Sequence, residues 1–170
     1  MERTGIITFQ GSGLTLLGEP VEVGQTAKNF SVINNELGAA TLEDYKGNIC
    51  IISSVPSLDT SVCSIQTKRF NDEAVNLGDD VKILTISMDL PFAQARWCGA
   101  MDVENVVTLS DYKDADFGMK YGVLIKELRL LSRAVFVVDK DGVITYSQIV
   151  PEITNEPNYE EVLAAVKKLQ

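Results

Sequence analysis

The order of the predicted secondary-structure elements limits the folds open to this chain more than any other feature. A short apolar run is typical of a buried strand, and apolar residues at helical spacing are typical of a helix. A strand, a helix and a second strand in this order form a β-α-β unit. A turn sequence between two later apolar runs predicts a hairpin. The main predicted elements are strands over 49–54 and 81–88, helices over 62–77 and 91–98, a strand over 106–109, a helical turn over 117–121, a hairpin over 134–138 and 143–146, and a helix from 159.

A β-α-β unit followed by a hairpin and a helix is the element order of a thioredoxin-like fold, so we expect an α/β protein of that type. The first 26 residues precede this pattern, and the runs 6–9 and 14–17 flank Gly11-Ser12-Gly13 as in a β-hairpin. Residues 30–33 are expected to form a further short strand. No repeat or linker interrupts the chain, so residues 1–170 are predicted to be one domain with an N-terminal β-hairpin extension over 1–26.

The absence of histidine excludes whole classes of chemistry. Ser-His-Asp and Cys-His hydrolases need an imidazole, as do zinc sites with histidine ligands and iron sites with two histidines and a carboxylate. The three cysteines, at 50, 63 and 98, include no C-x-x-C pair, which disfavours a disulfide-stapled secreted scaffold and a four-thiolate zinc site. We therefore expect a cytoplasmic protein with one or two reactive thiols and no metal.

The net charge of the chain indicates which kinds of partner it can bind. Fifteen Lys and Arg against 24 Asp and Glu give a net charge of -9, whereas a nucleic acid or an anionic membrane surface would attract a basic face. No apolar run approaches the roughly 20 residues of a membrane span, and no secretory signal is recognisable at the N-terminus. Neither nucleic acid nor membrane is therefore expected as a partner.

Cys63 is the thiol whose position favours reactivity. If Thr60 caps the helix, Cys63 lies in its first turn, where the helix dipole favours a thiolate, at a sheet edge that a ligand can reach. A free thiol with a pKa of about 8.5 is only about 3% ionised at pH 7, and ionisation to about 90% requires roughly 3.4 kcal/mol. The dipole supplies about 0.3–1 kcal/mol. A cation is needed as well, and without histidine it must be an arginine or a lysine.

The segment Ser54–Cys63 carries the pattern P-x-x-x-T-x-x-C through Pro56, Thr60 and Cys63. It closely resembles the active-site segment of bacterial thiol peroxidases, the atypical two-cysteine peroxiredoxins. Three more segments resemble the same family in the same order, so that the likeness covers essentially the whole chain. They are Asp89–Ala100, whose L-P-F-A-Q-x-R-x-C-G pattern is specific to this subfamily, then Ser132–Val135 and Glu152–Tyr159.

The resemblance implies an antioxidant enzyme, a peroxiredoxin that reduces hydrogen peroxide and alkyl hydroperoxides to water or alcohols. Cys63 would be the peroxidatic thiolate and become a sulfenic acid. Thr60 would orient the peroxide through its hydroxyl, and Pro56 would shield the sulfur from water and over-oxidation. Arg133 would be the required cation, because a guanidinium stays charged and offers several donors to the thiolate and the peroxide.

By the same resemblance, Cys98 is the resolving cysteine, which forms an intramolecular disulfide with Cys63. The two are 35 positions apart, and a disulfide needs their Cα atoms within about 7 Å, so we expect local unwinding during turnover. Thioredoxin would reduce the disulfide, no organic cofactor would be needed, and the protein would be a homodimer.

Two other functions are open to a protein with this fold. One is a thioredoxin-like disulfide oxidoreductase, which the missing C-x-x-C pair disfavours. The other is a chaperone without peroxidase activity. Cys50, in the apolar run Ile49–Ile52, is interpreted as a buried and inert thiol with a raised pKa, whereas Trp97 is either a core residue or part of a hydrophobic mouth.

Overall fold

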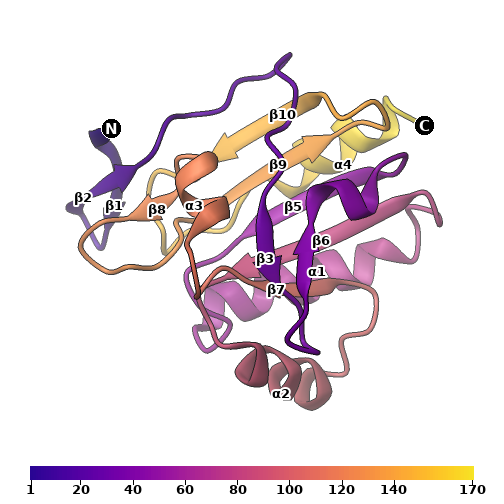
Figure 1. Ribbon diagram of the computed structural model, residues 1–170, viewed down its shortest axis with the longest axis horizontal. Helices are drawn as coiled ribbons and strands as arrows, with labels where there is room; N and C mark the ends of the chain where they lie inside the picture. Colours follow the sequence, from indigo (N-terminus) through magenta and orange to yellow (C-terminus); the bar gives the residue numbers. More distant parts are fainter.

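The computed structural model describes residues 1–170 and contains two sheets. The larger sheet has seven strands in the order β10-β9-β5-β6-β7-β3-β4, and the smaller has three in the order β1-β2-β8 (Figure 1). The strands are β1 (Glu2–Phe9), β2 (Ser12–Leu17), β3 (Ser31–Ile33), β4 (Ala39–Thr41), β5 (Ile49–Ser54), β6 (Val81–Ser87), β7 (Val107–Ser110), β8 (Leu124–Ile125), β9 (Ala134–Val138) and β10 (Ile144–Ile149). The helices are α1 (Ser61–Ala74), α2 (Pro91–Met101), α3 (Asp116–Lys120), α4 (Tyr159–Lys167) and the 3₁₀ helix η1 (Leu42–Tyr45).

Strands β5, β6 and β7 run parallel, and β9 joins them antiparallel at the other side of β5. The expected β-α-β unit is therefore present as β5-α1-β6, and the expected hairpin as β9-β10. This arrangement confirms the predicted α/β, thioredoxin-like fold. The register of β5 with β9 pairs Ser54 with Ala134, so the residues just before β9 lie beside the end of β5.

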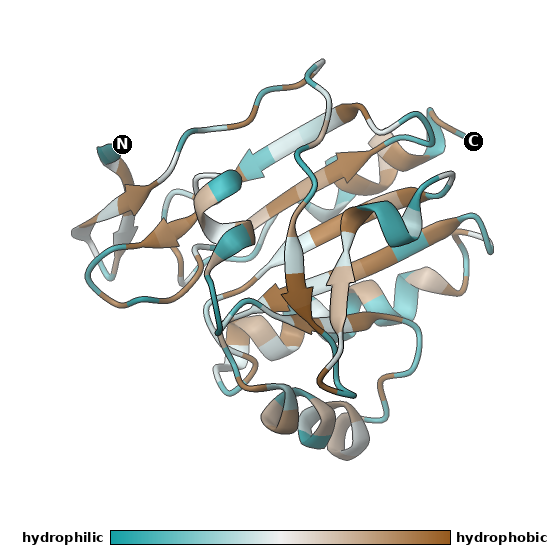
Figure 2. Ribbon diagram, in the orientation of Figure 1, coloured by the Kyte–Doolittle hydropathy of each residue, from teal (hydrophilic) through white to brown (hydrophobic).

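Each face of the large sheet is covered by a different set of elements, because alternate residues of a strand point to opposite faces. Ile49 and Ile51 of β5 pack with Phe70 of α1 and Val162 of α4. The opposite face is covered by α3 and by the segment around Phe30. Figure 1 shows α1 and α4 behind the sheet and α3 in front, and Figure 2 shows that the central strands are mostly hydrophobic.

The N-terminal hairpin is present, but its turn differs from the expected Gly11-Ser12-Gly13 loop. Phe9 pairs with Ser12, which leaves a two-residue turn of Gln10 and Gly11. Both have positive φ, 50° for Gln10 and 82° for Gly11. A two-residue hairpin turn with positive φ at both positions matches the right-handed twist of the strands, so Gly11 occupies a position that few other residues adopt without strain.

Several helices and strands end at other residues than predicted. Helix α1 ends at Ala74 rather than at 77, and the predicted strand over 143–146 instead runs to Ile149 as β10. Helix α2 does not end at Gly99 but continues to Met101, and Asp102 closes it in the left-handed conformation with φ 55°. Strands β4 and β8 and the 3₁₀ helix were not predicted, because each is too short to show a periodic pattern.

Candidate functional site

Cys63 lies at the third position of α1, as predicted, with Thr60 as the residue before the first turn. Thr60 has an extended backbone, with φ -94° and ψ 148°, and the helix begins at the next residue, Ser61. The side chain of Cys63 is fully buried in a small apolar cluster with Val55 and Leu58, and Trp97 of α2 packs against that cluster.

The guanidinium of Arg133 reaches this sulfur. Its Nη2 donates to Cys63 Sγ at 3.4 Å, and Nε and Nη2 donate to the backbone oxygen of Ile153 at 2.9 and 2.8 Å. Its Nη1 donates to Gln66 Oε1 at 2.8 Å. Arg133 immediately precedes β9, so the pairing of β9 with β5 places it beside the loop that carries the active-site pattern.

Arg133 is a buried cation without a carboxylate. Its side chain is only 2% exposed, and none of the ion pairs of the protein includes it. Buried charges are normally paired, because taking an unpaired ion out of water is costly. The sulfur of Cys63 is the one group in contact with this guanidinium that can ionise. The buried guanidinium therefore lies where it can donate a hydrogen bond to Cys63 Sγ.

Gln66 is a site residue that the sequence reasoning missed. It lies one turn after Cys63 on α1, is fully buried, and donates from Nε2 to Ser53 Oγ at 2.7 Å. Its amide oxygen then faces Arg133 Nη1, so Ser53 orients Gln66 and Gln66 orients the guanidinium. A polar residue at a core-facing helical position was the available signal, because buried polar groups are almost always hydrogen-bonded.

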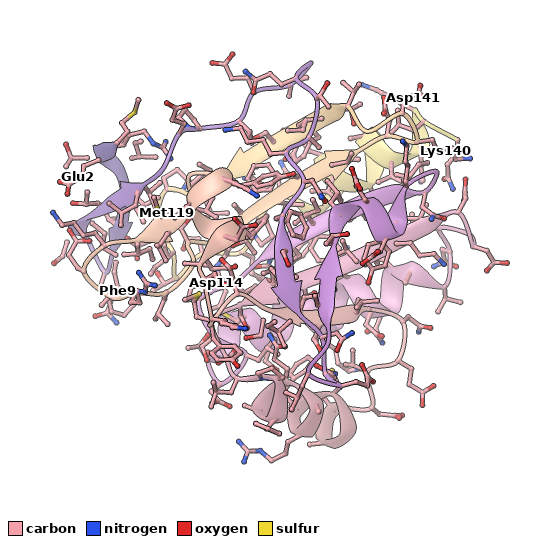
Figure 3. The ribbon with its side chains drawn as sticks, in the orientation of Figure 1. Glu2, Phe9, Asp114, Met119, Lys140 and Asp141 are labelled. Carbon is pink, nitrogen blue, oxygen red and sulfur yellow. The ribbon has the colours of Figure 1, made fainter.

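A cavity of about 150 Å³ lies at the N-terminus of α1, beside Arg133. The structure brings three of the predicted site residues together here, and the cavity wall consists of Pro56, Thr60, Arg133, Phe9, Ser61, Val62, Ile153 and Thr154. Figure 3 labels Phe9, the last residue of β1 in the small sheet. The hydroxyl of Thr60 donates to the backbone oxygen of Ser57 at 2.9 Å, which leaves its lone pairs free.

The expectation that a ligand reaches Cys63 directly is wrong for this conformation. The sulfur has no exposed surface and does not belong to the cavity wall, whereas Arg133, which contacts it, does. The apolar cluster of Val55 and Leu58 closes the sulfur off, because the first turn of α1 packs against both. A ligand in the cavity would contact Arg133, whereas the sulfur lies outside the cavity wall in this conformation.

The loop before α1 is tied to the loop before α2 by Asp89. One carboxylate oxygen accepts from Ser57 Oγ at 2.7 Å, and the other accepts from the backbone N–H of Leu58 at 2.8 Å and from Ser87 Oγ at 2.7 Å. Hydrogen bonds to a charged acceptor are roughly twice as strong as neutral ones. Asp89 therefore fixes the wall of the site, although the sequence reasoning gave it no role.

Cys98 is not in contact with Cys63. All three cysteines are free, and Cys98 lies half-buried inside α2 with its sulfur 3.6 Å from Thr108 Oγ1 of β7. Each of the two thiols faces its own partner, Arg133 for Cys63 and Thr108 for Cys98. Trp97 lies between the helices as a packing residue against the Cys63 cluster and the core, whereas Phe92 is exposed.

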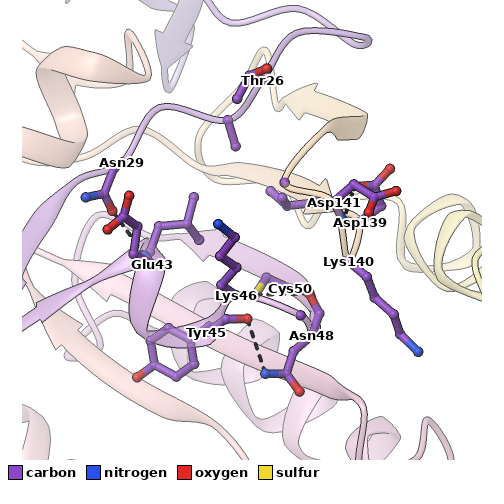
Figure 4. Close-up of a pocket in the computed structure, with 15 residues that line it drawn as sticks. Thr26, Asn29, Glu43, Tyr45, Lys46, Asn48, Cys50, Asp139, Lys140 and Asp141 are labelled. Carbon is purple, nitrogen blue, oxygen red and sulfur yellow. Dashed lines mark hydrogen bonds between the residues drawn. The ribbon is translucent and has the colours of Figure 1, made fainter.

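Cys50 lies in β5 and faces the other side of the sheet, below a separate cavity of about 180 Å³ (Figure 4). In Figure 4 its sulfur lies near Lys46 and Asn48. Burial raises the pKa of Cys50 to about 11, against a smaller opposing effect of Lys82. A thiol with this pKa stays protonated at neutral pH, as the sequence interpretation predicted.

Nowhere in the chain do three or more Cys, Asp or Glu side chains gather in a way that could hold a metal ion. None of the helices has the length and apolar character that a membrane crossing requires.

Comparison with known proteins adds independent evidence. The family model described as Redoxin matches residues 22–163. The chain is 57% identical to the thiol peroxidase of Oceanobacillus iheyensis over 95% of this chain and 98% of that protein, and 55% identical to that of Bacillus subtilis over 96% and 97%. A crystal structure of a peroxiredoxin-like protein from Aquifex aeolicus superposes with a TM-score of 0.91 at 42% identity, covering 99% of this chain and 98% of that one.

Proposed function

This chain belongs to the Redoxin family, and we propose that it is a thiol-dependent peroxidase, a peroxiredoxin, with Cys63 as its peroxidatic thiolate. The observation that carries the assignment to Cys63 is the buried guanidinium of Arg133, which has no carboxylate partner and donates to the sulfur at 3.4 Å. A cation held in a dry site stabilises a thiolate, and the thiolate is the nucleophilic form of cysteine.

In the first step, Cys63 Sγ attacks the near oxygen of a hydroperoxide. The O–O bond breaks, an S–O bond forms, and the departing oxygen takes a proton and leaves as water or an alcohol. Arg133 lies where it can stabilise negative charge on that oxygen, since it contacts the sulfur and also lines the cavity. Thr60 and Pro56 line the same cavity, which supports their roles in orienting the peroxide and in shielding the sulfur.

In the second step, the thiolate of Cys98 attacks Cys63 Sγ of the sulfenic acid. An S–S bond forms, the S–O bond breaks, and hydroxide leaves as water after taking a proton. Because the two sulfurs face different partners, α2 or the first turn of α1 must rearrange before this step. A dithiol then reduces the disulfide by exchange through a mixed disulfide, and we propose thioredoxin as that dithiol.

The remaining assignments belong to the same proposal: one domain over residues 1–170, a homodimer, and a place in the cytoplasm, where a thioredoxin pool keeps thiols reduced. A disulfide oxidoreductase without peroxidase activity is not favoured, because the two proposed working thiols lie on separate helices rather than in one C-x-x-C turn. A chaperone without peroxidase activity is not favoured by the thiol peroxidase relatives.

The test of the proposal is Cys63→Ser with Cys50→Ser as the matched control, both measured as peroxide consumed with excess dithiol. We expect Cys63→Ser to consume no peroxide above background and Cys50→Ser to keep most of the activity. Retention of most activity in Cys63→Ser would overturn the assignment. Sedimentation of the purified protein tests the dimer separately, since a monomer at all concentrations contradicts that part alone.

A further inference from the structure

The sulfur of Cys98 has one polar side-chain neighbour. Its Sγ lies 3.6 Å from Thr108 Oγ1, which belongs to the neighbouring strand β7 and is only 3% exposed. Thr108 in turn donates from its hydroxyl to Asn35 Oδ1 at 3.2 Å. The proposed resolving thiol is therefore the end of a short chain of polar groups that runs from α2 over β7 to the loop between β3 and β4.

The sheet places Asn35 at this point. Strand β3 pairs antiparallel with β7 through Ile33 and Ser110. Asn35 follows Ile33 by two residues and Thr108 precedes Ser110 by two, so the antiparallel register brings Asn35 opposite Thr108. The loop is held in shape by Asn34, whose Oδ1 accepts from the backbone N–H of Glu36 at 3.0 Å and of Gly38 at 2.8 Å. Asn35 is thus presented by a fixed turn rather than by a free loop.

The direction of the hydrogen bonds decides which form of Cys98 fits. The hydroxyl of Thr108 has one hydrogen, and its bond to Asn35 Oδ1, which can only accept, uses that hydrogen. In the contact with Cys98, where either atom could donate, the donor is then the S–H group. The side of Thr108 Oγ1 that faces Cys98 therefore carries lone pairs. A protonated thiol can donate a hydrogen bond to these lone pairs, whereas a thiolate has no hydrogen to donate and would face them directly.

We propose that Thr108 and Asn35 are positioning residues that hold Cys98 as a protonated thiol inside α2 and so slow the formation of the disulfide with Cys63. The expected effect on turnover rests on the proposed function, because it requires that Cys98 form a disulfide with Cys63. To react, Cys98 must break the S–H···O contact, lose its proton to water and leave the helix position. A cavity of about 250 Å³ lined by Cys98, Thr108 and Asn35 lets water reach the thiol.

The sheet offers a matched control one strand away. Thr85 of β6 pairs directly with Thr108, so the two lie on the same face of adjacent strands. Thr85 is 1% exposed, and its hydroxyl has no hydrogen-bond partner. Thr85→Val and Thr108→Val therefore remove the same atom from the same kind of environment, but only the second removes a contact with Cys98.

The experiment has two arms. In the first, one equivalent of hydrogen peroxide oxidises the reduced protein, and disulfide formation is followed by quenching and mass spectrometry. We expect Thr108→Val to form the disulfide about two- to fivefold faster than the parent, the change expected from losing a neutral hydrogen bond. Thr85→Val should leave the rate unchanged, Thr108→Ser should restore the parent rate, and oxidation of Cys63 should be equally fast in all.

The second arm does not depend on peroxidase activity. In a Cys50→Ala/Cys63→Ser background, Cys98 is the one thiol left, and its S–H stretching band is read by infrared spectroscopy. We expect Thr108→Val to move the band to the higher frequency of a free thiol, and Thr85→Val to leave it in place. An unmoved band in Thr108→Val, or the same rate change in both valine variants, would overturn the inference. If no variant forms a disulfide with peroxide, the proposed function fails instead, and the infrared arm still decides the role of Thr108.

Discussion

Arg133 Nη2 donates to Cys63 Sγ at 3.4 Å, although the two residues are 70 positions apart in the chain. The guanidinium is buried, is held by the backbone oxygen of Ile153 and by Gln66, and has no carboxylate partner. In the proposed mechanism this guanidinium takes the place of the imidazole that the protein lacks. Three testable consequences concern this contact or the two proposed working thiols, and a fourth concerns the buried carboxyl of Asp111.

Replacing Arg133 by methionine removes the charge and keeps much of the apolar volume. We expect the reaction of Cys63 with peroxide to slow roughly 100-fold, as when a donor that stabilises developing charge is deleted. The rate is readable from the fluorescence of Trp97, the one tryptophan, which packs against the Cys63 cluster. Arg69→Met is the control, since Arg69 pairs with Glu73 on the exposed side of α1. Equal rates in both variants would contradict the role of Arg133.

Gln66 is expected to act through Arg133 rather than on the peroxide. Gln66→Leu leaves a buried donor of Arg133 without its acceptor, so the free energy of unfolding should fall by about 1–3 kcal/mol. Gln66→Glu should instead slow the reaction of Cys63 with peroxide, because a carboxylate at this position competes with the sulfur for the guanidinium. Denaturant unfolding and Trp97 fluorescence measure the two effects. A Gln66→Glu protein that reacts as fast as the parent would show that the orientation of Arg133 is unimportant.

Cys98→Ser should separate the two chemical steps. Cys63 should be oxidised by the first equivalent of peroxide at the parent rate, because Cys98 does not contact it in the reduced protein. No intramolecular disulfide should form, and excess peroxide should convert Cys63 to higher oxidation states more readily than in the parent. Mass spectrometry of the quenched protein measures both. An intramolecular disulfide between Cys63 and Cys50 in this variant would show that Cys98 is not the required partner.

Asp111 should make stability depend on pH. It is buried, and burial raises its pKa to about 6, while the backbone N–H groups of Gly118 and Phe117 oppose this shift in part. An unfolded aspartate has a pKa of about 3.9, so the stabilising contribution is present below pH 4 and is lost as the pH rises through 6.

Relative to Asp111→Asn, the parent protein should therefore lose roughly 2 kcal/mol of unfolding free energy between pH 4 and pH 7. Urea unfolding at several pH values measures the difference. Asp114→Asn, at an exposed position of the same segment, should show no such change relative to the parent. A constant difference between the parent and Asp111→Asn across this range would contradict the prediction.

Local signals in the sequence were enough to predict much of this protein. Helical spacing and the expected cap at Thr60 placed Cys63 in the first turn of α1, and the apolar run of β5 predicted a buried and inert Cys50. The lack of histidine led to the expectation of a guanidinium or ammonium partner. These features are readable because a helix start and a strand face depend on residues within a few positions of one another.

The tertiary structure alone decided which groups meet. The pairing of Ser54 with Ala134 brings Arg133 beside the active-site loop, and the pairing of Ile33 with Ser110 brings Asn35 to Thr108. The complete burial of the Cys63 sulfur and the separate partners of the two thiols depend in the same way on how helices pack over the sheet. Spacing along the chain carries no record of such contacts, because strand order and register are set by the sheet as a whole.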